Sequence, residues 1–482
     1  MKNICTLIPV FCGLLLSSCN ADFLNSYPTS SIVIENAILS VKEAQYAING
    51  IYDAMQNYGY YGGYVQIYGD VRGDDIQSYS PSRTSYYMYS YDHRAISTNA
   101  ASLWTRPFVV IREACRIIDA IDNNVKDGTE SERSRVKGHA IALRAMAHFD
   151  IVKTHGYPFA KDNGASWGAP LIDHVLDKDE FPLRNTVRET FDFITSELER
   201  AIPMMATTKN VGQFNAYGAR ALLARAYLYC ENNRKAYDVA KALIEELKQN
   251  GLYTLYTSEN YVGSFALNAK LGSESLVEIV NSATDNQSWD CLAWMMSWWG
   301  YRAMVVTKDF VDLMSQDPDD VRNGMYALRD DNGIIKASLE KYPGETPTMG
   351  NRENNYPIIR LSEVYLIAAE AGVKINGAER SEALAYLNTI VQRGNPENIV
   401  SDAQFTLERV LEERRKELIG EGHRFYDLLR NGKTIIRGEN GYHLDNAPMS
   451  IDWNFEKCIL PLGADLFRFN NNLQQNPGYT TE

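Results

Sequence analysis

The stretch Leu407 to Gly432, LERVLEERRKELIGEGHRFYDLLRNG, indicates the fold class more strongly than any other part of the chain. It predicts two amphipathic helices joined by a turn. Gly420 and Gly422 are expected to end the first helix, because glycine readily takes the left-handed backbone that closes a helix. Apolar residues fall close to one face of the first helix and recur in the second. They are Val410, Leu411, Leu418 and Ile419, then Phe425, Tyr426, Leu428 and Leu429.

The charged run Glu412 to Glu417 lies in the first of these helices. Its spacing favours ion pairs on a solvated face over a catalytic cluster. His423 follows a glycine, and no second histidine lies nearby in the sequence. We therefore interpret it as a structural contact between the two helices and not as a metal ligand or a base.

Several other segments read as helices. Ser40 and Glu43 have the spacing of a capping box, and an apolar stripe at helical spacing follows them. A helix is expected from about Ser102 to Asn123. The next one starts near Thr129 and Glu132, a second possible capping box, and ends near position 155.

Two helical pairs resemble each other. Ala219 to Lys248 resembles one tetratricopeptide unit, with small residues where paired helices approach and large residues in the groove. Arg360 to Arg393 repeats the plan. Long insertions separate these units, so a regular solenoid is not expected. No Pro/Ser-rich linker divides the chain, and we interpret it as one compact body.

Four separated segments carry a family resemblance. The order Glu-Arg-Arg, Glu, Gly-His-Arg, Asp-Leu within 407–432 resembles the C-terminal signature of the SusD/RagB family, outer-membrane lipoproteins of Bacteroidetes that capture nutrient glycans. The segments Ile459 to Leu462 and Asn470 to Tyr479 resemble the family's closing residues, and Tyr356 to Leu366 resembles its entry to a helical pair. Blocks in the right order are more specific than one short motif. The resemblance covers about 22–479.

The resemblance implies a mainly α fold. Tetratricopeptide-like helical pairs would form a scaffold, with long loop insertions and a few short β-strands. It implies a binding protein and not an enzyme, with no cofactor. It also implies a partner, a SusC-like TonB-dependent outer-membrane transporter that receives the glycan. Calcium is possible but not indicated, since Asp317, Asp319 and Asp320 are typical of a solvated turn.

The N-terminus reads as a lipoprotein signal. Lys2 precedes the apolar core Leu7 to Leu16, which is too short to span a bilayer. Leu16-Ser17-Ser18-Cys19 looks like a bacterial lipobox, so residues 1–18 would be removed and Cys19 would carry lipid. Residues 19–482 would form a single SusD-like domain, anchored in the outer membrane by its lipid and facing the cell exterior. The formal net charge of −13 argues against nucleic acid as a partner.

The remaining cysteines do not suggest a metal centre. Cys115, Cys230, Cys291 and Cys458 are far apart and contain no Cys-x-x-Cys pair, so no zinc site is indicated. Cys115 and Cys230 lie in helical apolar patterns and are expected to be buried thiols.

Two segments differ from the scaffold. Tyr52 to Tyr91 holds 11 of the 30 tyrosines and is broken by glycines, so most of it is expected to be loop. Trp289 to Tyr301, WDCLAWMMSWWGY, holds four of the seven tryptophans. Aromatic rings match the apolar face of a sugar, while acids, amides and arginine bond its hydroxyl rim. The candidate ligand-binding residues are Trp289, Trp294, Trp298, Trp299, Tyr301, Asp74, Asp75 and Tyr79.

Other interpretations remain open at this point. The tryptophans could fill a core beneath a long loop, and we expect about half of the four to be exposed. If the segment is helical, Trp294 and Trp298 share a face. A glycoside hydrolase would need two carboxylates about 5–10 Å apart, and adjacent Asp74 and Asp75 suit that poorly. A helical-repeat adaptor of the outer membrane, without a small ligand, is the third reading.

Overall fold

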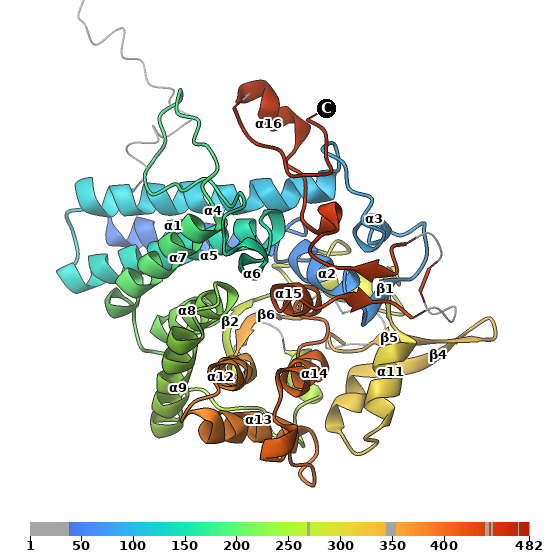
Figure 1. Cartoon of the computed structure of the whole chain (residues 1–482). Helices are drawn as coiled ribbons and strands as arrows, with labels where there is room; N and C mark the ends of the chain where they lie inside the picture. The colour runs from blue at the N-terminus through green and yellow to red at the C-terminus, as the bar shows by residue number, and fades with distance from the viewer. Residues whose placement is uncertain are drawn as a thin grey trace, which may run out of the picture.

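The computed structural model describes residues 38–267, 270–343, 353–438, 443–444, 447–470 and 472–481. The predicted signal segment 1–18 and Cys19 lie outside the described residues. Helices dominate the fold, and strands are few and short (Figure 1). The helices are α1 (Val41–Gln56), α2 (Tyr64–Val71), α3 (Tyr86–Tyr89), α4 (Thr98–Asn123), α5 (Glu130–His155), α6 (Phe159–Asp162), α7 (Val187–Ala201), α8 (Ala216–Tyr229), α9 (Asn233–Asn250), α10 (Leu292–Met296), α11 (Lys308–Ser315), α12 (Leu361–Ile375), α13 (Arg380–Gly394), α14 (Leu407–Glu417), α15 (Arg424–Arg430) and α16 (Ala464–Phe469).

The helices pack in one continuous path. α1 packs on α4, α4 on α5, α5 on α7, and α7 on α8. The path then runs through the pair α8–α9 to α12, which packs on both α13 and α14 (Figure 1). The predicted pairs 219–248 and 360–393 are therefore confirmed as α8–α9 and α12–α13. The mainly α fold class is confirmed too.

Local sequence accounts for several helix starts. Ser40 accepts a hydrogen bond from the backbone N–H of Glu43 at the start of α1. Thr129 and Glu132 form a complete capping box at the start of α5, as the spacing predicted. Such caps satisfy backbone N–H groups that have no partner within the helix.

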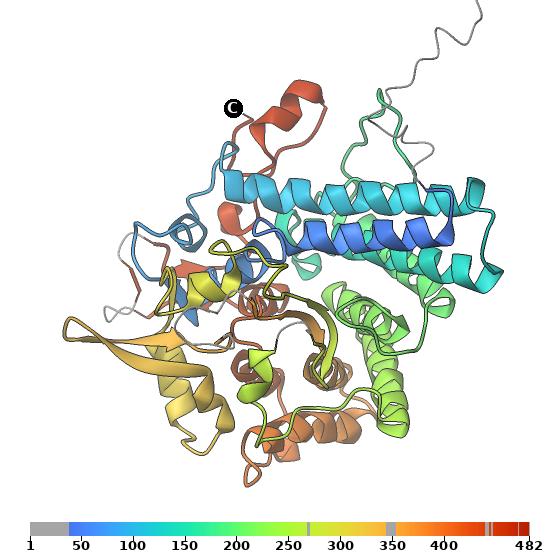
Figure 2. The same ribbon diagram turned by 180° about the vertical axis from the view of Figure 1, so that it is seen from behind.

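Within the described residues, three small sheets lie beside the helices. The largest is antiparallel with strand order β1-β3-β5-β4, and its hairpin β4–β5 projects from the body (Figure 2). Asn332 and Gly333 both have positive φ at the tip, as expected of an Asn-Gly hairpin turn. The strands are β1 (Ile76–Ser78), β2 (Ser275–Ile279), β3 (Met304–Val306), β4 (Tyr326–Asp331), β5 (Ile334–Leu339), β6 (Tyr356–Arg360), β7 (Ile435–Ile436) and β8 (Ser450–Ile451); β2 pairs with β6, and β7 with β8.

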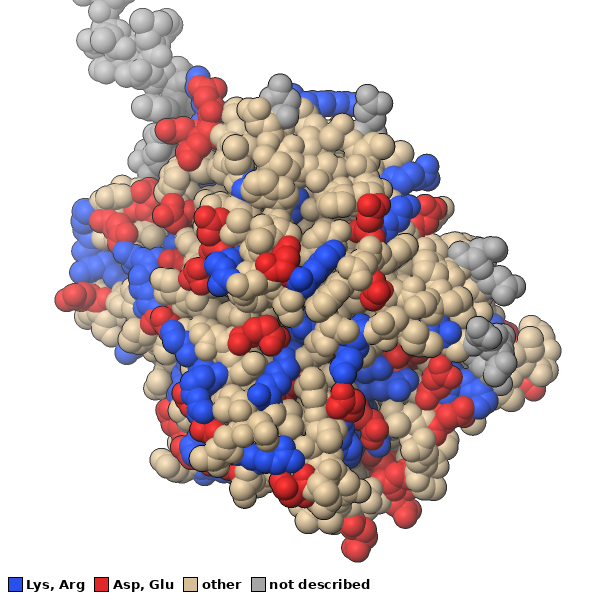
Figure 3. All heavy atoms as spheres, in the orientation of Figure 1, with Lys and Arg blue, Asp and Glu red and all other residues tan. Residues whose placement is uncertain are grey.

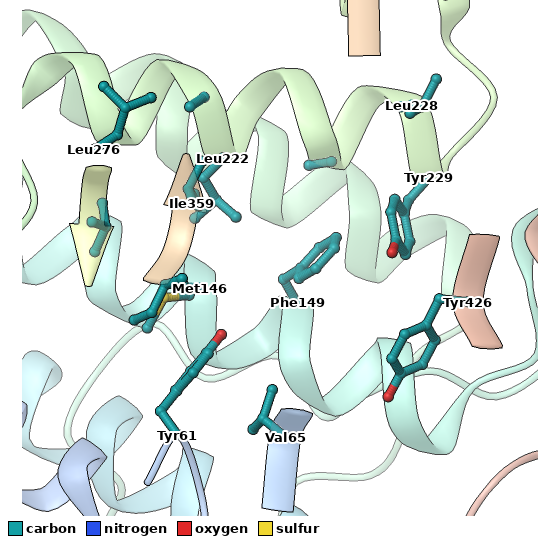
Figure 4. Close-up of a cluster of buried hydrophobic side chains, with 14 of the residues drawn as sticks. Tyr61, Val65, Met146, Phe149, Leu222, Leu228, Tyr229, Leu276, Ile359 and Tyr426 are labelled. Carbon is teal, nitrogen blue, oxygen red and sulfur yellow. The ribbon is translucent and has the colours of Figure 1, made fainter. Parts of the chain in front are cut away.

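One hydrophobic cluster joins early and late parts of the chain. Figure 4 shows its centre, where Phe149 of α5 lies among side chains from other elements. Tyr229 of α8 meets the Phe149 ring edge-on, with centroids 5.1 Å apart. The cluster includes Val65 near the N-terminal end and Tyr426 in α15. A core shared in this way ties the C-terminal helices to the first third of the chain.

The charged run of α14 forms ion pairs, as predicted, but apart from Glu412 it does not present the solvated face that the spacing suggested. Glu413, Arg414 and Glu417 are each no more than 1% exposed. Arg360 forms ion pairs with Glu417 at 3.0 Å and with Glu421 at 2.6 Å. Since these three side chains of α14 are shielded from water, their charges are matched by ion pairs with residues of other elements.

Arg414 and Arg430 continue this buried network on the other side of α14. The Arg414 guanidinium binds Asp427 at 2.7 Å, and Arg430 binds both Asp427 and Glu370. Against the cost of burial, the charge of Arg430 holds the pKa of the Glu370 carboxyl well below its ordinary value. The Glu-Arg-Arg and Asp-Leu letters of the signature therefore encode ion pairs that hold α12, α14 and α15 together.

The tyrosine-rich segment is more regular and more buried than predicted. It contains α2, β1 and α3 as well as turns. Tyr60, Tyr68, Tyr89 and Tyr91 are fully buried. Different elements cover them: Tyr60 donates to Asp150 of α5 at 2.6 Å, Tyr68 meets Phe425 edge-on, and Arg437 lies over the Tyr89 ring at 4.1 Å. α2 also lies close to the signature segment, where a Cβ on Gly69 would be 2.0 Å from the carbonyl oxygen of Gly422.

Candidate functional site

The tryptophan loop joins β2 to β3, and its position is fixed by backbone contacts. The N–H of Leu292 donates to the Gly62 carbonyl at 2.9 Å, which ties α10 to the turn before α2. The N–H of Tyr301 donates to the Trp294 carbonyl at 3.0 Å, so the loop folds back on itself. Gly300 allows this, because a Cβ there would lie 2.2 Å from that same carbonyl oxygen.

The loop exposes part of its aromatic surface. Trp299 is 61% exposed, Trp289 44% and Tyr301 42%, whereas Trp298 is 8% exposed. Trp294 is half-buried, and its ring meets Trp289 at 4.5 Å and Tyr301 at 6.4 Å between centroids. Two of the four tryptophans are exposed, as expected. Trp294 and Trp298 do not share a helix, because α10 ends at Met296.

Tyr79 brings the tyrosine-rich segment to the same surface. Its N–H donates to the Ala303 carbonyl at 2.9 Å, next to the pairing of β1 with β3. The Tyr79 ring meets the Trp298 ring edge-on at 6.5 Å. The two segments singled out in the sequence thus meet in space. We use the name aromatic platform for two groups of rings and one neighbour: Trp289, Trp294 and Tyr301, which contact one another through Trp294; Tyr79 with Trp298 packed against it; and the exposed Trp299, which follows Trp298 in the chain.

Charged residues border the platform. The Tyr79 hydroxyl donates to the Asp331 carboxylate at 2.7 Å, and Lys336 binds the same carboxylate at 3.1 Å. The hydrogen bond from Tyr79 is the main reason that the pKa of Asp331 is lowered. The guanidinium of Arg302 stacks over Trp298 at 4.5 Å, and Arg329 lies 5.8 Å from the Trp299 ring centre. Aromatic faces beside donors and acceptors are the chemistry that a sugar ring requires.

Asp74 and Asp75 are not part of this surface. Both are buried, at 9% and 3% exposure. Arg424 binds Asp74 through two hydrogen bonds of 2.7 and 2.9 Å, and Arg415 binds Asp75 at 2.5 Å. Arginines of the signature segment bind both carboxylates, so we leave Asp74 and Asp75 out of the proposed ligand surface.

The pKa values of the two carboxyls, Asp74 and Asp75, shift in opposite directions. Burial raises the pKa of Asp74, but Arg424 outweighs it, and the pKa falls to about 2. Burial is the largest effect on Asp75 and raises its pKa to about 6, against the charge of Arg415. Gly422 completes the contact, since its N–H donates to the buried Asp70 carboxylate at 3.0 Å. We call residues 70–75 the acidic turn.

The turn at Asp317 and Asp320 is also structural. Asp320 is 3% exposed and pairs with Arg322, so the solvated turn predicted here was wrong at that residue. Asp317 accepts a hydrogen bond from Asn395 at 2.9 Å. No cluster of three or more His, Cys, Asp or Glu in the described ranges could hold a metal ion.

Two further findings concern the cysteines and the question of a membrane-spanning helix. Cys115 is buried and Cys230 is partly buried, and neither forms a disulfide. Burial raises the pKa of the Cys230 thiol to about 11, so it is protonated at neutral pH. Among the helices of the described residues, none is both long and apolar enough to span a membrane.

Sequence reasoning missed the charged border of the platform. Asp331, Lys336 and Arg329 belong to a hairpin some 250 residues after Tyr79 in the chain. The hairpin itself had a signal, since Asn332-Gly333 is a strong turn dipeptide. Nothing in the sequence showed that this hairpin lies beside the tryptophan loop.

Comparison with known proteins identifies the family. Residues 323–479 match the SusD family, and residues 22–228 match a family described as "Starch-binding associating with outer membrane". A crystal structure of a SusD superfamily protein from Bacteroides vulgatus is 46% identical, covers 92% of this chain and 99% of its own, and superposes with a TM-score of 0.89. The chain belongs to the SusD/RagB family.

More distant SusD-like proteins share the fold or the sequence over most of their length. A SusD-like protein, P2, from Formosa agariphila is 25% identical over 97% of this chain and 99% of its own. A structure described as a laminarin-binding SusD-like protein is 23% identical, covers 91% of this chain and 99% of its own, and has a TM-score of 0.70. The SusD family match includes all of α14 and α15, where the buried ion pairs lie. The SusD signature therefore corresponds to the interior of the scaffold and not to the platform.

Proposed function

We propose that this SusD-like protein binds an oligosaccharide or polysaccharide on the aromatic platform, without cleaving it. The carrying observation is the platform itself, where Trp289, Trp299 and Tyr301 are each more than 40% exposed beside charged groups. Isolated exposed aromatic residues are ordinary, but Trp289 and Tyr301 both contact Trp294, and a group of neighbouring aromatic rings indicates a binding surface. The "Starch-binding" description of the matching family and the laminarin-binding relative support a glycan as the ligand.

Capture would combine stacking with hydrogen bonding. Sugar C–H faces would lie on Trp299 and Trp289, and ring hydroxyls would meet Arg302 and Asp331 at the border. Each contact would be weak, and a long glycan that spans several of them would bind more tightly. Acidic and basic side chains are interspersed over the face of the molecule in Figure 3. Because a neutral glycan carries no charge, we expect its binding to depend little on salt.

The glycan would pass to a SusC-like TonB-dependent transporter. In this proposal Cys19 carries the lipid that anchors the protein in the outer membrane, with residues 19–482 as a single domain on the exterior face. The family's description as outer-membrane associating supports this location. Replacing Cys19 with Ala is expected to release the protein from the membrane fraction.

The two other readings of the sequence are less well supported. A hydrolase needs two available carboxylates around one bond. Asp74 and Asp75 are bound by arginines, and Asp331 is bound by Tyr79 and Lys336. An adaptor without a small ligand would not need exposed tryptophans, and two are exposed here.

Affinity electrophoresis tests the proposal. Residues 20–482 would be run in gels that contain laminarin, starch, xylan or mannan, beside Trp299→Ala and a matched control, Trp167→Ala. Trp167 is 42% exposed and lies away from the platform in the sequence. We expect at least one glycan to retard the wild type and the control but not Trp299→Ala, with no shortening of the glycan on incubation. Equal retardation of all three proteins would contradict the platform, and shortened products would contradict a non-catalytic role.

A further inference from the structure

The two groups of rings in the aromatic platform differ in the charges beside them. Trp289 is followed in the chain by Asp290, which is exposed. The half-buried Tyr79 has cations beside its ring instead. Lys336 Nζ lies 4.0 Å from the centre of that ring, and the guanidinium carbon of Arg83 lies 5.6 Å from it. Cations therefore gather on the Tyr79 side of the platform.

Arg302 adds a third cation at the hydroxyl end of Tyr79. Its guanidinium lies 4.5 Å from the Trp298 ring centre, and Trp298 meets the Tyr79 ring edge-on. The pKa of Tyr79 is raised, chiefly by its hydrogen bond to Asp331, and the charge of Arg302 acts against that rise. The positive charge of Arg302 thus reaches the Tyr79 hydroxyl.

One of these three cations is neutralised at close range. The Asp331 carboxylate lies 3.1 Å from Lys336 but 3.9 Å from Arg302, which is too far for a hydrogen bond. In the described part of the chain, no ion pair involves Arg83. One carboxylate therefore faces three cations, and this surface is positive although the whole chain has a formal net charge of −13.

The backbone at Arg302 also points to a use of its side chain. Its φ is 45°, in the left-handed region that glycine adopts more readily than any other residue. Its N–H donates to the Ser297 carbonyl at 3.2 Å, which holds this conformation. A non-glycine residue in such a conformation is typical of a functional site. Here the conformation places a guanidinium over Trp298, with 37% of the side chain exposed.

Two arginines beside aromatic rings suit an acidic sugar. A guanidinium is charged at every physiological pH, and its N–H groups match the oxygens of a carboxylate or a similar oxyanion in pairs. A sugar ring that stacks on Tyr79 or Trp298 would bring an acidic substituent to the edge of these rings, where the arginines lie. A neutral sugar would leave the charges of Arg83 and Arg302 unmatched.

We propose that the Tyr79 side of the platform binds the anionic group of an acidic glycan, either the carboxylate of a uronic acid or a sulfate ester. Arg302 and Arg83 hold the anion while the sugar ring lies on the neighbouring aromatic side chains. Neutral glycans bind through the rings alone and more weakly. This inference rests on the proposed function, since the glycan must lie on the platform for its anion to reach the arginines. It names the ligand more closely as an acidic glycan.

Acidic polysaccharides and their neutralised forms test this inference. Polygalacturonate and alginate carry carboxylates, and carrageenan carries sulfates. Each would be compared with its carboxyl-reduced or desulfated form, with laminarin as a neutral glycan. In about 20 mM salt, where exposed charges are weakly screened, at least one acidic polymer should bind the wild type about tenfold more tightly than its neutralised form. The polymer that shows this preference identifies the anion as carboxylate or sulfate.

Salt provides a second readout. In about 0.5 M NaCl the screening length is only a few ångströms, so the preference should fall to about twofold or less. The affinity for laminarin should change less than about twofold over the same range, because it carries no charge.

Variants that remove charge assign the preference to the arginines. Arg302→Gln and Arg83→Gln should each reduce it about two- to fivefold, as expected for an exposed ion pair. Arg302→Lys should keep more of it, because the charge remains although the paired N–H groups are lost. Arg188→Gln is the matched control, since Arg188 is exposed and lies 4.9 Å from the Phe159 ring centre in another part of the fold. Circular dichroism and melting of each variant would establish that it is folded.

Asp331→Asn is expected to have the opposite effect. It removes the one carboxylate among these cations but keeps an acceptor for the Tyr79 hydroxyl. The affinity for the acidic polymer should therefore rise about twofold or more, since a nearby negative charge no longer opposes the ligand. A purely structural role for this group of charges predicts no such gain.

Three results would overturn the inference. Equal binding of acidic and neutralised polymers by the wild type at low salt would remove the anion while leaving glycan capture on the platform intact. A preference that neither Arg302→Gln nor Arg83→Gln lowers would assign the anion to another surface. No binding to any polymer, laminarin included, would contradict the proposed function itself.

Discussion

Asp74 with Arg424 and Asp331 with Arg302 are both acid–arginine pairs, but they lie in opposite environments. Asp74 is buried and held at 2.7 Å by an arginine of the signature segment. Arg302 is 37% exposed in its side chain, lies 3.9 Å from Asp331 and stacks on Trp298. Asp74 is bound by Arg424 and largely shielded from water, whereas Arg302 remains accessible to a ligand. Residue type alone could not distinguish them, because burial decides whether a charged group holds the fold or meets a ligand.

This contrast divides the molecule by role. The acidic turn and the signature segment connect residues 340 to 352 positions apart through buried charges and hydrogen bonds. The aromatic platform lies outside that network. We therefore expect substitutions in the buried network to change stability, and substitutions on the platform to change binding.

The largest effect is expected at Arg360. Its guanidinium is 1% exposed and pairs with Glu274, Glu417 and Glu421. Arg360→Met would leave these buried carboxylates short of a counter-charge, at a cost of about 3–5 kcal/mol in the free energy of unfolding. Urea denaturation followed by circular dichroism measures this. Arg380→Met is the control, because its pair with Asp402 is exposed and should contribute under about 1 kcal/mol. Equal stability of the two variants would argue against the buried network.

The next effect is a dependence of stability on pH. His148 is fully buried, and burial lowers its pKa to about 4. The unfolded chain binds a proton near pH 6.5 and the folded chain does not, so stability present above pH 6.5 is lost as the pH falls toward 4. Linkage gives a loss on the order of 3 kcal/mol for this group.

His148→Gln isolates that contribution. His148 Nδ1 lies 2.8 Å from the Arg144 carbonyl, and Nε2 accepts from the N–H of Ile172 at 3.2 Å. A glutamine amide has both a donor and an acceptor but does not titrate. Urea denaturation between pH 7 and 4 should therefore show a flatter decline for His148→Gln. An identical slope in the variant and the wild type would show that His148 does not titrate as described.

A smaller effect is expected where the acidic turn meets the signature segment. Gly69→Ala would place a Cβ 2.0 Å from the Gly422 carbonyl oxygen, a backbone atom that cannot rotate away. The resulting shift should lower the free energy of unfolding by about 1–3 kcal/mol. Gly50→Ala in α1 is the control, since no atom lies within 4 Å of its added Cβ, and it should stabilise the helix slightly. Thermal unfolding of both variants tests the contact, and a neutral Gly69→Ala would contradict it.

The smallest effect on stability is expected on the platform. Trp299 is 61% exposed, so Trp299→Ala should change the free energy of unfolding by less than about 0.5 kcal/mol. Trp104→Ala provides the contrast, because Trp104 is 3% exposed and a buried tryptophan costs about 3–5 kcal/mol to remove. Equal changes in the free energy of unfolding for the two variants would contradict the separation of a stabilising scaffold from an exposed platform.

The sequence predicted the scaffold better than the surface. Helix caps such as Thr129 and the paired helices 219–248 and 360–393 follow from local spacing, and the structure has them. The burial of Glu413 and Glu417 could not be predicted from the sequence. Their partners Arg322 and Arg360 come from distant elements, so helical periodicity alone suggested a solvated face.

The candidate site shows the same limit. Side-chain chemistry pointed to the tryptophan loop and to Tyr79, and the structure brings them together. The same reasoning selected Asp74 and Asp75, because an acid near tyrosines resembles a sugar-binding group until its arginine partners are known. Asp331 and Lys336 were missed because a hairpin from another part of the chain carries them to the platform.

A titration of the best-binding glycan into the wild type and into Trp289→Ala/Trp299→Ala tests the division of roles most directly. Calorimetry would give the affinity, and thermal unfolding of the same samples would give the stability. The account predicts that affinity falls at least about tenfold while Tm stays within about 2 °C, because both side chains are exposed aromatic contacts. Unchanged affinity, or a Tm that falls in step with it, would contradict a ligand surface separate from the scaffold.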